Sequence, residues 1–403
     1  MIVTIERLGH LGDGVAPGPV YVPMALPGEV VEGAVANGRM EAPRIVTPSP
    51  ERVKPPCPHY RSCGGCALMH ASDDFVAGWK RDVVATALGA QGLSADMRPV
   101  QTSSPRSRRR ATFSGRRTKK GATVGFHGRA SGTIVEVTGC RLLDPALVAL
   151  LPALSEITRV GASRKSELSL TATLTGGGVD LAVSGGKPLD QSLFSSLAPA
   201  AEGAGIARLT WGGELVINLR PAFQQFGRTS VIPPAGAFLQ ATAEGEAALV
   251  AAVREAVGPA SRVADLFAGS GTFALPLAET AGVHAVEGES AMLSALDSGW
   301  RRGHDLHLLT TEPRDLFRRP LLPDELAGFE AVVIDPPRAG AEAQTVELAR
   351  SNVPVIASVA CNPVTFARDA RILVDAGFHI DWLQVVDQFR WSPHVELIAR
   401  FSR

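Results

Sequence analysis

The chain has 403 residues, 45% of them hydrophobic, and its 40 Lys and Arg balance 40 Asp and Glu. This length suits two or three domains with cores of their own, and no long uncharged apolar run indicates a membrane span or a secretory signal. We therefore expect a cytoplasmic protein whose five cysteines bind metal or take part in catalysis, because disulfides are rare in reducing compartments.

Charge is distributed unevenly along the chain. From residue 233 onward there are 14 Lys and Arg against 22 Asp and Glu, whereas the first 232 residues have 26 against 18. The densest basic run, PRSRRRATFSGRRTKKG, contains no acidic residue. It can neutralise phosphates, which favours nucleic-acid binding over a merely solvated hairpin with charged edges. Its cations are Arg106, Arg108, Arg109, Arg110, Arg116, Arg117, Lys119 and Lys120.

The first half of the chain is predicted to contain small β-rich units. Residues 1–52 alternate short β-rich runs with the turn signals GDG, PGP and PGE, which predicts a small β-barrel, and a Pro-rich linker follows. Apolar spacing predicts a helix over 72–90 with Ser72 as N-cap. The runs ATFSGRR, ATVGFHG and GTIVEVTG are typical of consecutive strands.

From Val263 the pattern changes to short apolar strands separated by helical segments: RVADLF, VHAVE, EAVVIDPP and VPVIASVA. This alternation predicts an α/β domain with a parallel, doubly wound sheet that binds ligands at the carboxyl ends of its strands. The runs FHIDWLQVVDQF and HVELIARF predict a final pair of strands in a hairpin.

A Gly-rich turn, DLFAGSGTFALPLA, lies between a predicted strand and helix, where Gly269 and Gly271 let the backbone approach a ligand. Glu287 ends the next strand, a position suited to ribose hydroxyls of a nicotinamide cofactor or of S-adenosylmethionine. The run DPPRAGA, which begins with Asp335 at a predicted strand end, resembles the fourth motif of class I S-adenosylmethionine-dependent methyltransferases. Asp335 could otherwise cap the next element, with Pro-Pro as a stiff turn.

Two residues suit catalysis at carbon 5 of a pyrimidine. Cys361 follows an apolar strand and precedes a helix, whose N-terminus lowers a thiol's pKa; otherwise it is a small buried hydrophobe. Thiolate addition at carbon 6 of uracil makes carbon 5 nucleophilic, and a general base must later remove the carbon-5 proton. Glu396, in SPHVELIARF, is the candidate base, although by itself it would be an ordinary surface Glu.

The motifs DLFAGSGTF, VEGE, DPPRAGA, ACNPVTFARD and PHVELIARF, in this order, resemble the RNA uracil-C5 methyltransferases, the family of RlmD, RlmC and TrmA. The resemblance covers nearly the whole chain and implies a Rossmann-like catalytic domain, with Cys361 as nucleophile and Glu396 as base. It implies cofactor contacts by Gln240, Phe267, Gly269, Thr272, Glu287, Asp315 and Asp335. Thr272 and Thr242 depart from the family's commoner Asn, and Asp315 lies in a segment whose register is hard to assign.

The remaining cysteines form the pattern C-x5-C-x2-C plus a distant one. Four thiolates at this spacing favour an iron–sulfur cluster over zinc, which ligand type alone does not exclude. The resemblance likewise implies a [4Fe–4S] cluster on Cys57, Cys63, Cys66 and Cys140. We expect it to be a structural staple, with redox sensing as the alternative.

We therefore expect a TRAM-like RNA-binding barrel over residues 1–52, a central α+β iron–sulfur domain over 53–232 and a methyltransferase domain over 233–403. The expected partner is RNA, 23S rRNA first and the tRNA T-loop second, without membrane or DNA, and the protein is expected to act as a monomer. The rival functions are an exocyclic-amine RNA methyltransferase, a cytosine-C5 enzyme and a non-catalytic RNA-binding assembly factor. Alanine at Cys361 should abolish a uracil-C5 enzyme and largely spare an amine one, and a cytosine-C5 enzyme is less favoured because DPPRAGA lacks the second cysteine that those enzymes usually carry in the fourth motif.

Overall fold

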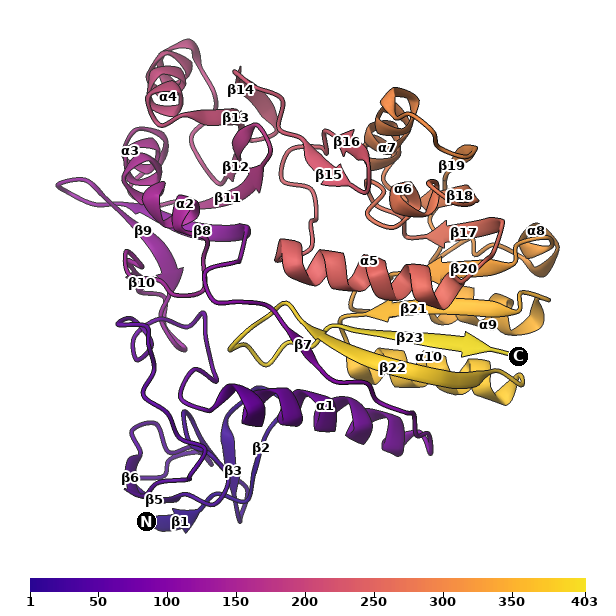
Figure 1. The fold of residues 1–403 in the computed structure, drawn as a ribbon. Helices are drawn as coiled ribbons and strands as arrows, with labels where there is room; N and C mark the ends of the chain where they lie inside the picture. The colour runs from indigo at the N-terminus through magenta and orange to yellow at the C-terminus, as the bar shows by residue number, and fades with distance from the viewer.

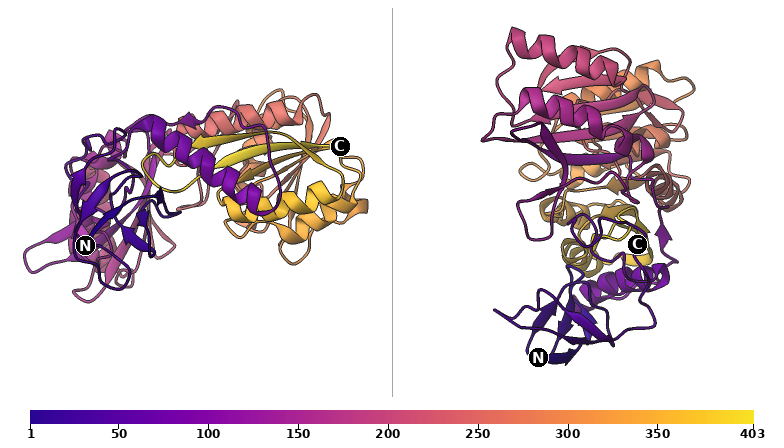
Figure 2. Two further views of the ribbon diagram at one scale, coloured as in Figure 1. Left: turned by 90° about the horizontal axis from the view of Figure 1, so that it is seen from below. Right: turned by 90° about the vertical axis from the view of Figure 1, so that its left-hand side faces the viewer.

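A computed structural model describes all residues, 1–403. The N-terminal unit and a central unit lie on one side of the C-terminal unit, and a long helix runs from the first to the last (Figures 1 and 2). None of the ten helices combines the length and the apolar character needed to cross a bilayer.

The N-terminal residues form two three-stranded sheets around one small apolar core that includes Ile5, Val22 and Met40. One sheet contains β1 (Ile2–Thr4), β5 (Val30–Glu32) and β6 (Arg44–Thr47), and the other contains β2 (Arg7–Leu8), β3 (Gly14–Ala16) and β4 (Val20–Val22). The prediction of short strands in this region is therefore confirmed.

Helix α1 (Asp73–Ala90) begins where the sequence predicts it, because the Oγ atom of Ser72 accepts a hydrogen bond from the backbone N–H of Phe75 at 3.2 Å. Its buried face carries Val84 and Leu88 into the core of the C-terminal unit. A short strand, β7 (Gln101–Thr102), then joins the edge of the C-terminal sheet. The part of α1 from Lys80 onward and β7, expected in the central domain, thus pack on the C-terminal unit, whereas Val76 packs with Leu8 and Leu26 of the N-terminal unit.

The central unit is a seven-stranded sheet with helices on one face (Figure 1). In spatial order its strands are β10 (Ile134–Val135), β9 (Ala122–His127), β8 (Arg110–Arg117), β11 (Glu167–Thr175), β12 (Gly178–Ser184), β13 (Ile206–Trp211) and β14 (Glu214–Asn218). Its helices are α2 (Pro145–Ala149), α3 (Leu151–Gly161) and α4 (Gln191–Gly203). Leu154 and Leu197 of two of these helices share a core with Phe113 of β8.

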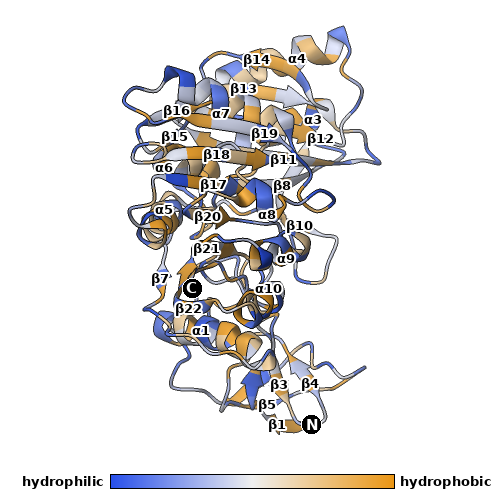
Figure 3. Ribbon diagram, turned by 90° about the vertical axis from the view of Figure 1, so that its right-hand side faces the viewer, coloured by the Kyte–Doolittle hydropathy of each residue, from blue (hydrophilic) through white to orange (hydrophobic).

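The C-terminal unit is built on an eight-stranded sheet with predominantly apolar strands (Figure 3). In spatial order it contains β19 (Leu309–Pro313), β18 (Gly282–Glu287), β17 (Arg262–Leu266), β20 (Ala331–Ile334), β21 (Val355–Ala360), β23 (Leu397–Ser402), β22 (His379–Asp387) and β7. The strands from β19 to β21 are parallel, and β23 is antiparallel to both its neighbours. The predicted parallel sheet and final antiparallel pair are confirmed.

Helices cover both faces of this sheet, which makes a three-layer arrangement with two separate cores. One face is covered by α5 (Ala243–Val257), α6 (Ala274–Leu277) and α7 (Ser290–Arg302), and the other by α1, α8 (Pro323–Leu326), α9 (Glu342–Arg350) and α10 (Pro363–Asp375). The hairpin of β15 (Gln224–Phe226) and β16 (Thr229–Val231) packs against α7. Ser103 Oγ, just after β7, and Thr242 Oγ1, at the N-cap of α5, lie 2.7 Å apart.

Candidate active site

A cavity of about 820 Å³ opens at the carboxyl ends of the parallel strands, the edge at which doubly wound sheets bind ligands. Of the residues predicted from the sequence, it is lined by Phe267, Gly269, Glu287, Asp315, Asp335, Cys361 and Glu396. The cavity therefore brings together residues that are up to 129 positions apart in the sequence.

The Gly-rich turn forms one wall of the cavity. Gly269 and Gly271 have φ of 56° and 99°, backbone conformations that glycine adopts without strain. Phe267 also has a positive φ, of 61°, so that its ring is held at the cavity by a constrained backbone. The N–H of Gly269 donates to Oε2 of Glu287 at 3.0 Å, which fixes the carboxylate at the end of β18.

Carboxylates dominate the electrostatics of this wall. Burial, and then the charges of Asp335 and Glu287, raise the pKa of Asp265 well above its usual range, and both of its carboxylate oxygens lack a hydrogen-bond partner. Burial also raises the pKa of Asp335. A cavity bordered by several carboxylates suits a cationic ligand such as a sulfonium, and the close backbone approach at Gly269 leaves room for it.

Cys361 and Glu396 are neighbours across the sheet. Ala360 of β21 pairs with Leu397 of β23, and this is the last pair of the ladder. Cys361 follows Ala360 and Glu396 precedes Leu397, so both residues lie directly beyond the same end of the ladder, and the charge of Glu396 acts on the Cys361 thiol. Both side chains line the cavity.

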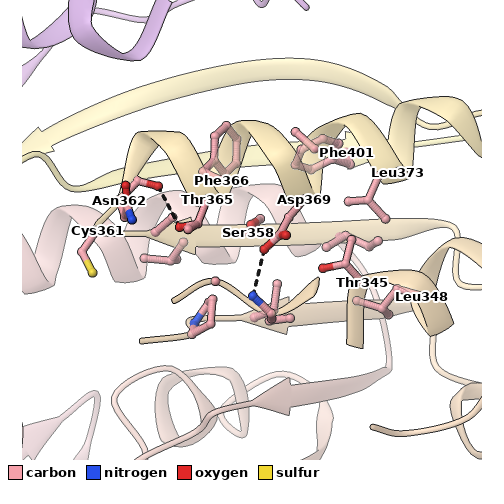
Figure 4. A pocket seen from close by; sticks show the side chains of 18 of the residues that line it. Thr345, Leu348, Ser358, Cys361, Asn362, Thr365, Phe366, Asp369, Leu373 and Phe401 are labelled. Atoms are coloured by element: carbon pink, nitrogen blue, oxygen red, sulfur yellow. Dashed lines mark hydrogen bonds between the residues drawn. The ribbon is translucent and has the colours of Figure 1, made fainter. Parts of the chain in front are cut away.

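Cys361 directly precedes Asn362, the N-cap of α10, as predicted (Figure 4). Asn362 Oδ1 accepts a hydrogen bond from the N–H of Val364 at 3.1 Å. The lowered thiol pKa that was expected from this helix start is wrong. Burial, and then the carboxylates of Glu396 and Asp335, raise the pKa of Cys361 to about 11. The guanidinium of Arg338 acts in the opposite direction but does not compensate for them.

Glu396 is held by a buried amide network. Nε2 of Gln388 donates to Oε2 of Glu396 at 3.0 Å and to Oε1 of Gln240. Burial, and then the charge of Asp335, raise the pKa of Glu396, whereas the bond from Gln388 lowers it. Gln240 therefore lies beside the expected base, although it is absent from the cavity lining, as is Thr272.

Several cavity residues were not singled out from the sequence as site residues. They are Arg108, Phe238, Met292, Arg338, Phe389 and His394. Phe238 is 63% exposed and lines the cavity, so its ring is accessible to a ligand. In the sequence, its position two residues before Gln240 was the feature that could have indicated a place at the site. Arg108 faces the ring of Phe389, and burial lowers its pKa while Cys66 and Cys140 raise it.

The four cysteines outside the active site come together around Tyr60 and Trp391. Burial, and then the charges of the other three cysteines, raise the pKa of Cys66 to about 12. Backbone N–H groups point at sulfur: Gly65 N lies 3.4 Å from Cys63 Sγ, and Leu142 N lies 3.4 Å from Cys140 Sγ. No three His, Cys, Asp or Glu side chains are close enough together to hold a single ion.

The basic run is not one continuous surface, in contrast to the sequence prediction. Arg109 pairs with Glu246 and Arg116 with Glu167, and Arg110 donates to the carbonyl of Gly236. Distant parts of the chain supply these partners, so the cations are divided between structural contacts and solvent. The run's fully exposed cations without an ion pair are Arg106, Lys119 and Lys120.

Comparisons with known proteins agree with this site. The model of the tRNA (Uracil-5-)-methyltransferase family matches residues 311–401, which contain Asp335, Cys361 and Glu396. An uncharacterized RNA methyltransferase of Brucella suis biovar 1 (strain 1330) is 44% identical over 404 residues, which cover 100% of this chain and 97% of the relative. The 23S rRNA (uracil(1939)-C(5))-methyltransferase RlmD of Chromohalobacter salexigens is 32% identical over 431 residues, covering 100% and 89%.

A solved structure shares the fold over the full length. It is the tRNA (uracil-54, C5)-methyltransferase of Pyrococcus abyssi in complex with S-adenosyl-L-homocysteine, with a TM-score of 0.78, 22% identity, and coverage of 100% of this chain and 99% of that one. The fold is thus that of class I methyltransferases. With relatives matching end to end, the chain belongs to the RNA uracil-C5 methyltransferases, a family of S-adenosylmethionine-dependent enzymes.

Proposed function

We propose that the protein methylates carbon 5 of a specific uridine in 23S rRNA through a covalent adduct with Cys361. The observation that supports this most is the placement of Cys361 and Glu396 directly beyond the paired ends of β21 and β23, on one cavity with Asp335. S-adenosylmethionine would supply the electrophilic methyl group. Phe267, Gly269, Glu287, Asp315 and Asp335 are the cavity residues proposed to hold it. Gln240 and Thr272, which do not line the cavity, are proposed as further contacts from the family resemblance alone.

Each proposed step has a group in this cavity. The Cys361 thiolate adds to carbon 6 of the uracil, and its electron pair makes carbon 5 able to take the methyl group. Glu396 then removes the carbon-5 proton, and the carbon–sulfur bond breaks. Because a stacked base cannot reach the thiol, the uridine is flipped into the cavity, where the exposed ring of Phe238 offers a stacking surface.

The 23S rRNA is favoured over tRNA because the relative named for 23S rRNA is the more similar of the two at 32% identity. Nucleoside mass spectrometry on separated rRNA and tRNA from a deletion strain tests this choice. Loss of 5-methyluridine from rRNA alone is expected. Loss from tRNA alone would keep the chemistry and change the substrate.

Substitution of Cys361 by Ala separates the chemical classes. A uracil-C5 enzyme loses both methylation and its denaturation-resistant complex with RNA, whereas an exocyclic-amine enzyme keeps its activity. An assembly factor without catalysis leaves every methylated nucleoside of the deletion strain unchanged. Retention of 5-methyluridine formation by the Cys361→Ala variant would contradict the proposed roles of Cys361 and Glu396.

We propose further that Cys57, Cys63, Cys66 and Cys140 hold a [4Fe–4S] cluster and that the N-terminal sheets act as a TRAM-like RNA-binding unit. The fit of the cluster rests on the donor set: burial, and with it the charges of neighbouring thiols, raise the pKa of Cys63, Cys66 and Cys140, which a cationic centre bound among the sulfurs would offset. A zinc ion bound by all four thiolates would require neighbouring sulfurs to lie about 3.8 Å apart, because tetrahedral Zn–S bonds are about 2.3 Å long. His59 and His70 already have partners, Gly139 N and Tyr60 Oη.

A further inference from the structure

Gln388 is a buried polar residue that the proposed chemistry does not yet use. It follows directly on β22, is 1% exposed, and lies between the segment 240–242 and Glu396. Three hydrogen bonds fix its amide, and they occupy the oxygen and both N–H groups. A buried amide with every donor in use has one orientation.

The orientation of this amide follows from its backbone partner. The N–H of Ala241 lies 2.6 Å from Oε1 of Gln388, and an N–H can only donate, so this atom must be the amide oxygen. The nitrogen therefore faces the two oxygens on its other side, Oε1 of Gln240 and Oε2 of Glu396. The contact with Glu396 is thus an N–H donated to a carboxylate.

This contact makes the two oxygens of Glu396 unequal. Oε2 accepts from Gln388 at 3.0 Å, whereas Oε1 makes no hydrogen bond within the chain although the side chain borders the cavity. A proton bound at Oε2 would have to displace the N–H of Gln388. A proton bound at Oε1 leaves that bond intact, because the carbonyl oxygen of a neutral acid still accepts.

We propose that Gln388 is a positioning residue for the proton-removal step: it holds Oε2 of Glu396, favours the ionised carboxylate and leaves Oε1 as the atom that takes the carbon-5 proton. This inference rests on the proposed function. In the step, the proton of carbon 5 moves to Oε1 and its electron pair forms the double bond between carbons 5 and 6. The bond from carbon 6 to Sγ of Cys361 breaks, and its pair returns to the thiolate.

Electrostatics support the same role. Burial and the Asp335 charge disfavour the ionised form of Glu396, and among these contacts the Gln388 hydrogen bond favours it. Gln388→Met removes the donor without changing any charge, so the surrounding charged and titratable groups stay as they are. Those groups are Asp335, Arg338, Cys361 and His394 of the cavity, Arg108, the Arg109–Glu246 pair and the Lys80–Asp387 pair.

The test follows the decay of the covalent protein–RNA complex in single-turnover experiments across pH, with unmodified 23S rRNA transcribed in vitro and tritiated at uracil carbon 5. The thiol is already bonded in the adduct, so titration of Cys361 does not enter the decay rate. Since only ionised Glu396 takes the proton, decay and tritium release quicken as pH rises through its pKa. Loss of a hydrogen bond to a charged group should move this rise upward by about one to two pH units in Gln388→Met.

The matched control is Gln384→Met on the same strand. Gln384 is 8% exposed, but its Nε2 donates to the carbonyl of Pro99, away from the cavity. Its decay profile should coincide with that of the wild type. Gln388→Asn, whose amide is withdrawn by one methylene, should shift the pH dependence of adduct decay in the same direction as Gln388→Met. This variant tests the role of Gln388 if Gln388→Met does not fold.

The outcomes distinguish a failure of the Gln388 role from a failure of the proposed function. An unshifted rise in folded Gln388→Met or Gln388→Asn, with tritium release by the wild type intact, overturns the role of Gln388 alone. A uniformly lower rate at every pH also overturns it, because misplacement without a pKa change has that effect. If the wild type releases no tritium and forms no adduct, the proposed function fails and this inference fails with it.

Discussion

Replacement of Lys80 by Met tests how firmly α1 is fixed to the C-terminal sheet. Nζ of Lys80 donates to Oδ1 of Asp387 at 2.5 Å and to the carbonyl of Phe389 at 3.1 Å. The side chains of the ion pair are 0% and 1% exposed. Without the ammonium, the carboxylate stays buried without a counter-charge, which costs about 3–5 kcal/mol.

For domains of this size class, each kcal/mol lowers Tm by about 2–4 °C, so Lys80→Met should lower Tm by about 6–20 °C in differential scanning fluorimetry. Adding Asp387→Asn removes the orphaned charge, while its Oδ1 can still accept from the N–H of Phe389, now 3.1 Å away. The double variant should therefore recover most of the loss. Arg301→Met breaks an exposed pair with Asp297 and should lower Tm by under about 2 °C.

Two results would refute this reasoning about the buried pair. If Lys80→Met and the double variant lose the same Tm, the orphaned charge is not the cause of the loss. If Lys80→Met behaves like Arg301→Met, the pair contributes no more than an exposed one, and α1 is held by its apolar face alone.

Three other changes have distinct expected results. Asp335→Asn removes the charge that raises the pKa of Glu396, so the increase of the adduct decay rate with pH should occur at lower pH, opposite to Gln388→Met. A shift to higher pH would contradict the assignment. Phe238→Ala should weaken RNA binding by about 5- to 150-fold in a filter assay, with Tm unchanged because the ring is exposed. Cys140→Ser should lower the iron and sulfide content of purified protein, whereas Cys361→Ser should leave it at about four each per chain; zinc in place of iron would exclude the cluster.

The features that were predicted from the sequence are those set by local chemistry. The Ser72 cap needs only a hydroxyl three residues before a free N–H, and it is found where expected. The strand Ala331–Ile334 is apolar throughout, and Arg262–Leu266 is buried from its second residue onward, because both faces of the sheet are covered, so their signal is strong. Asp335 and Cys361 lie at strand ends, where a parallel sheet brings side chains to one edge.

The features that could not be predicted depend on contacts between distant residues. Nothing near Gln101 indicates that it pairs with Val386, 285 positions later in the chain. The basic run could not be divided into paired and free cations, since the partners of Arg109 and Arg116 lie more than fifty positions away. The raised pKa of Cys361 likewise results from burial, and then from carboxylates at the ends of two other strands, which outweigh the local helix terminus.

The hydrogen bond between Ser103 and Thr242 joins the segment after β7 to the N-cap of α5. The central sheet is attached to the C-terminal unit at a second place as well, because the β15–β16 hairpin that follows it packs against α7. Next to the first attachment, Arg109 N–H donates to the carbonyl of Ala241, whose own N–H donates to Gln388. The amide beside Glu396 is therefore connected, through a single backbone residue, to the start of the central sheet.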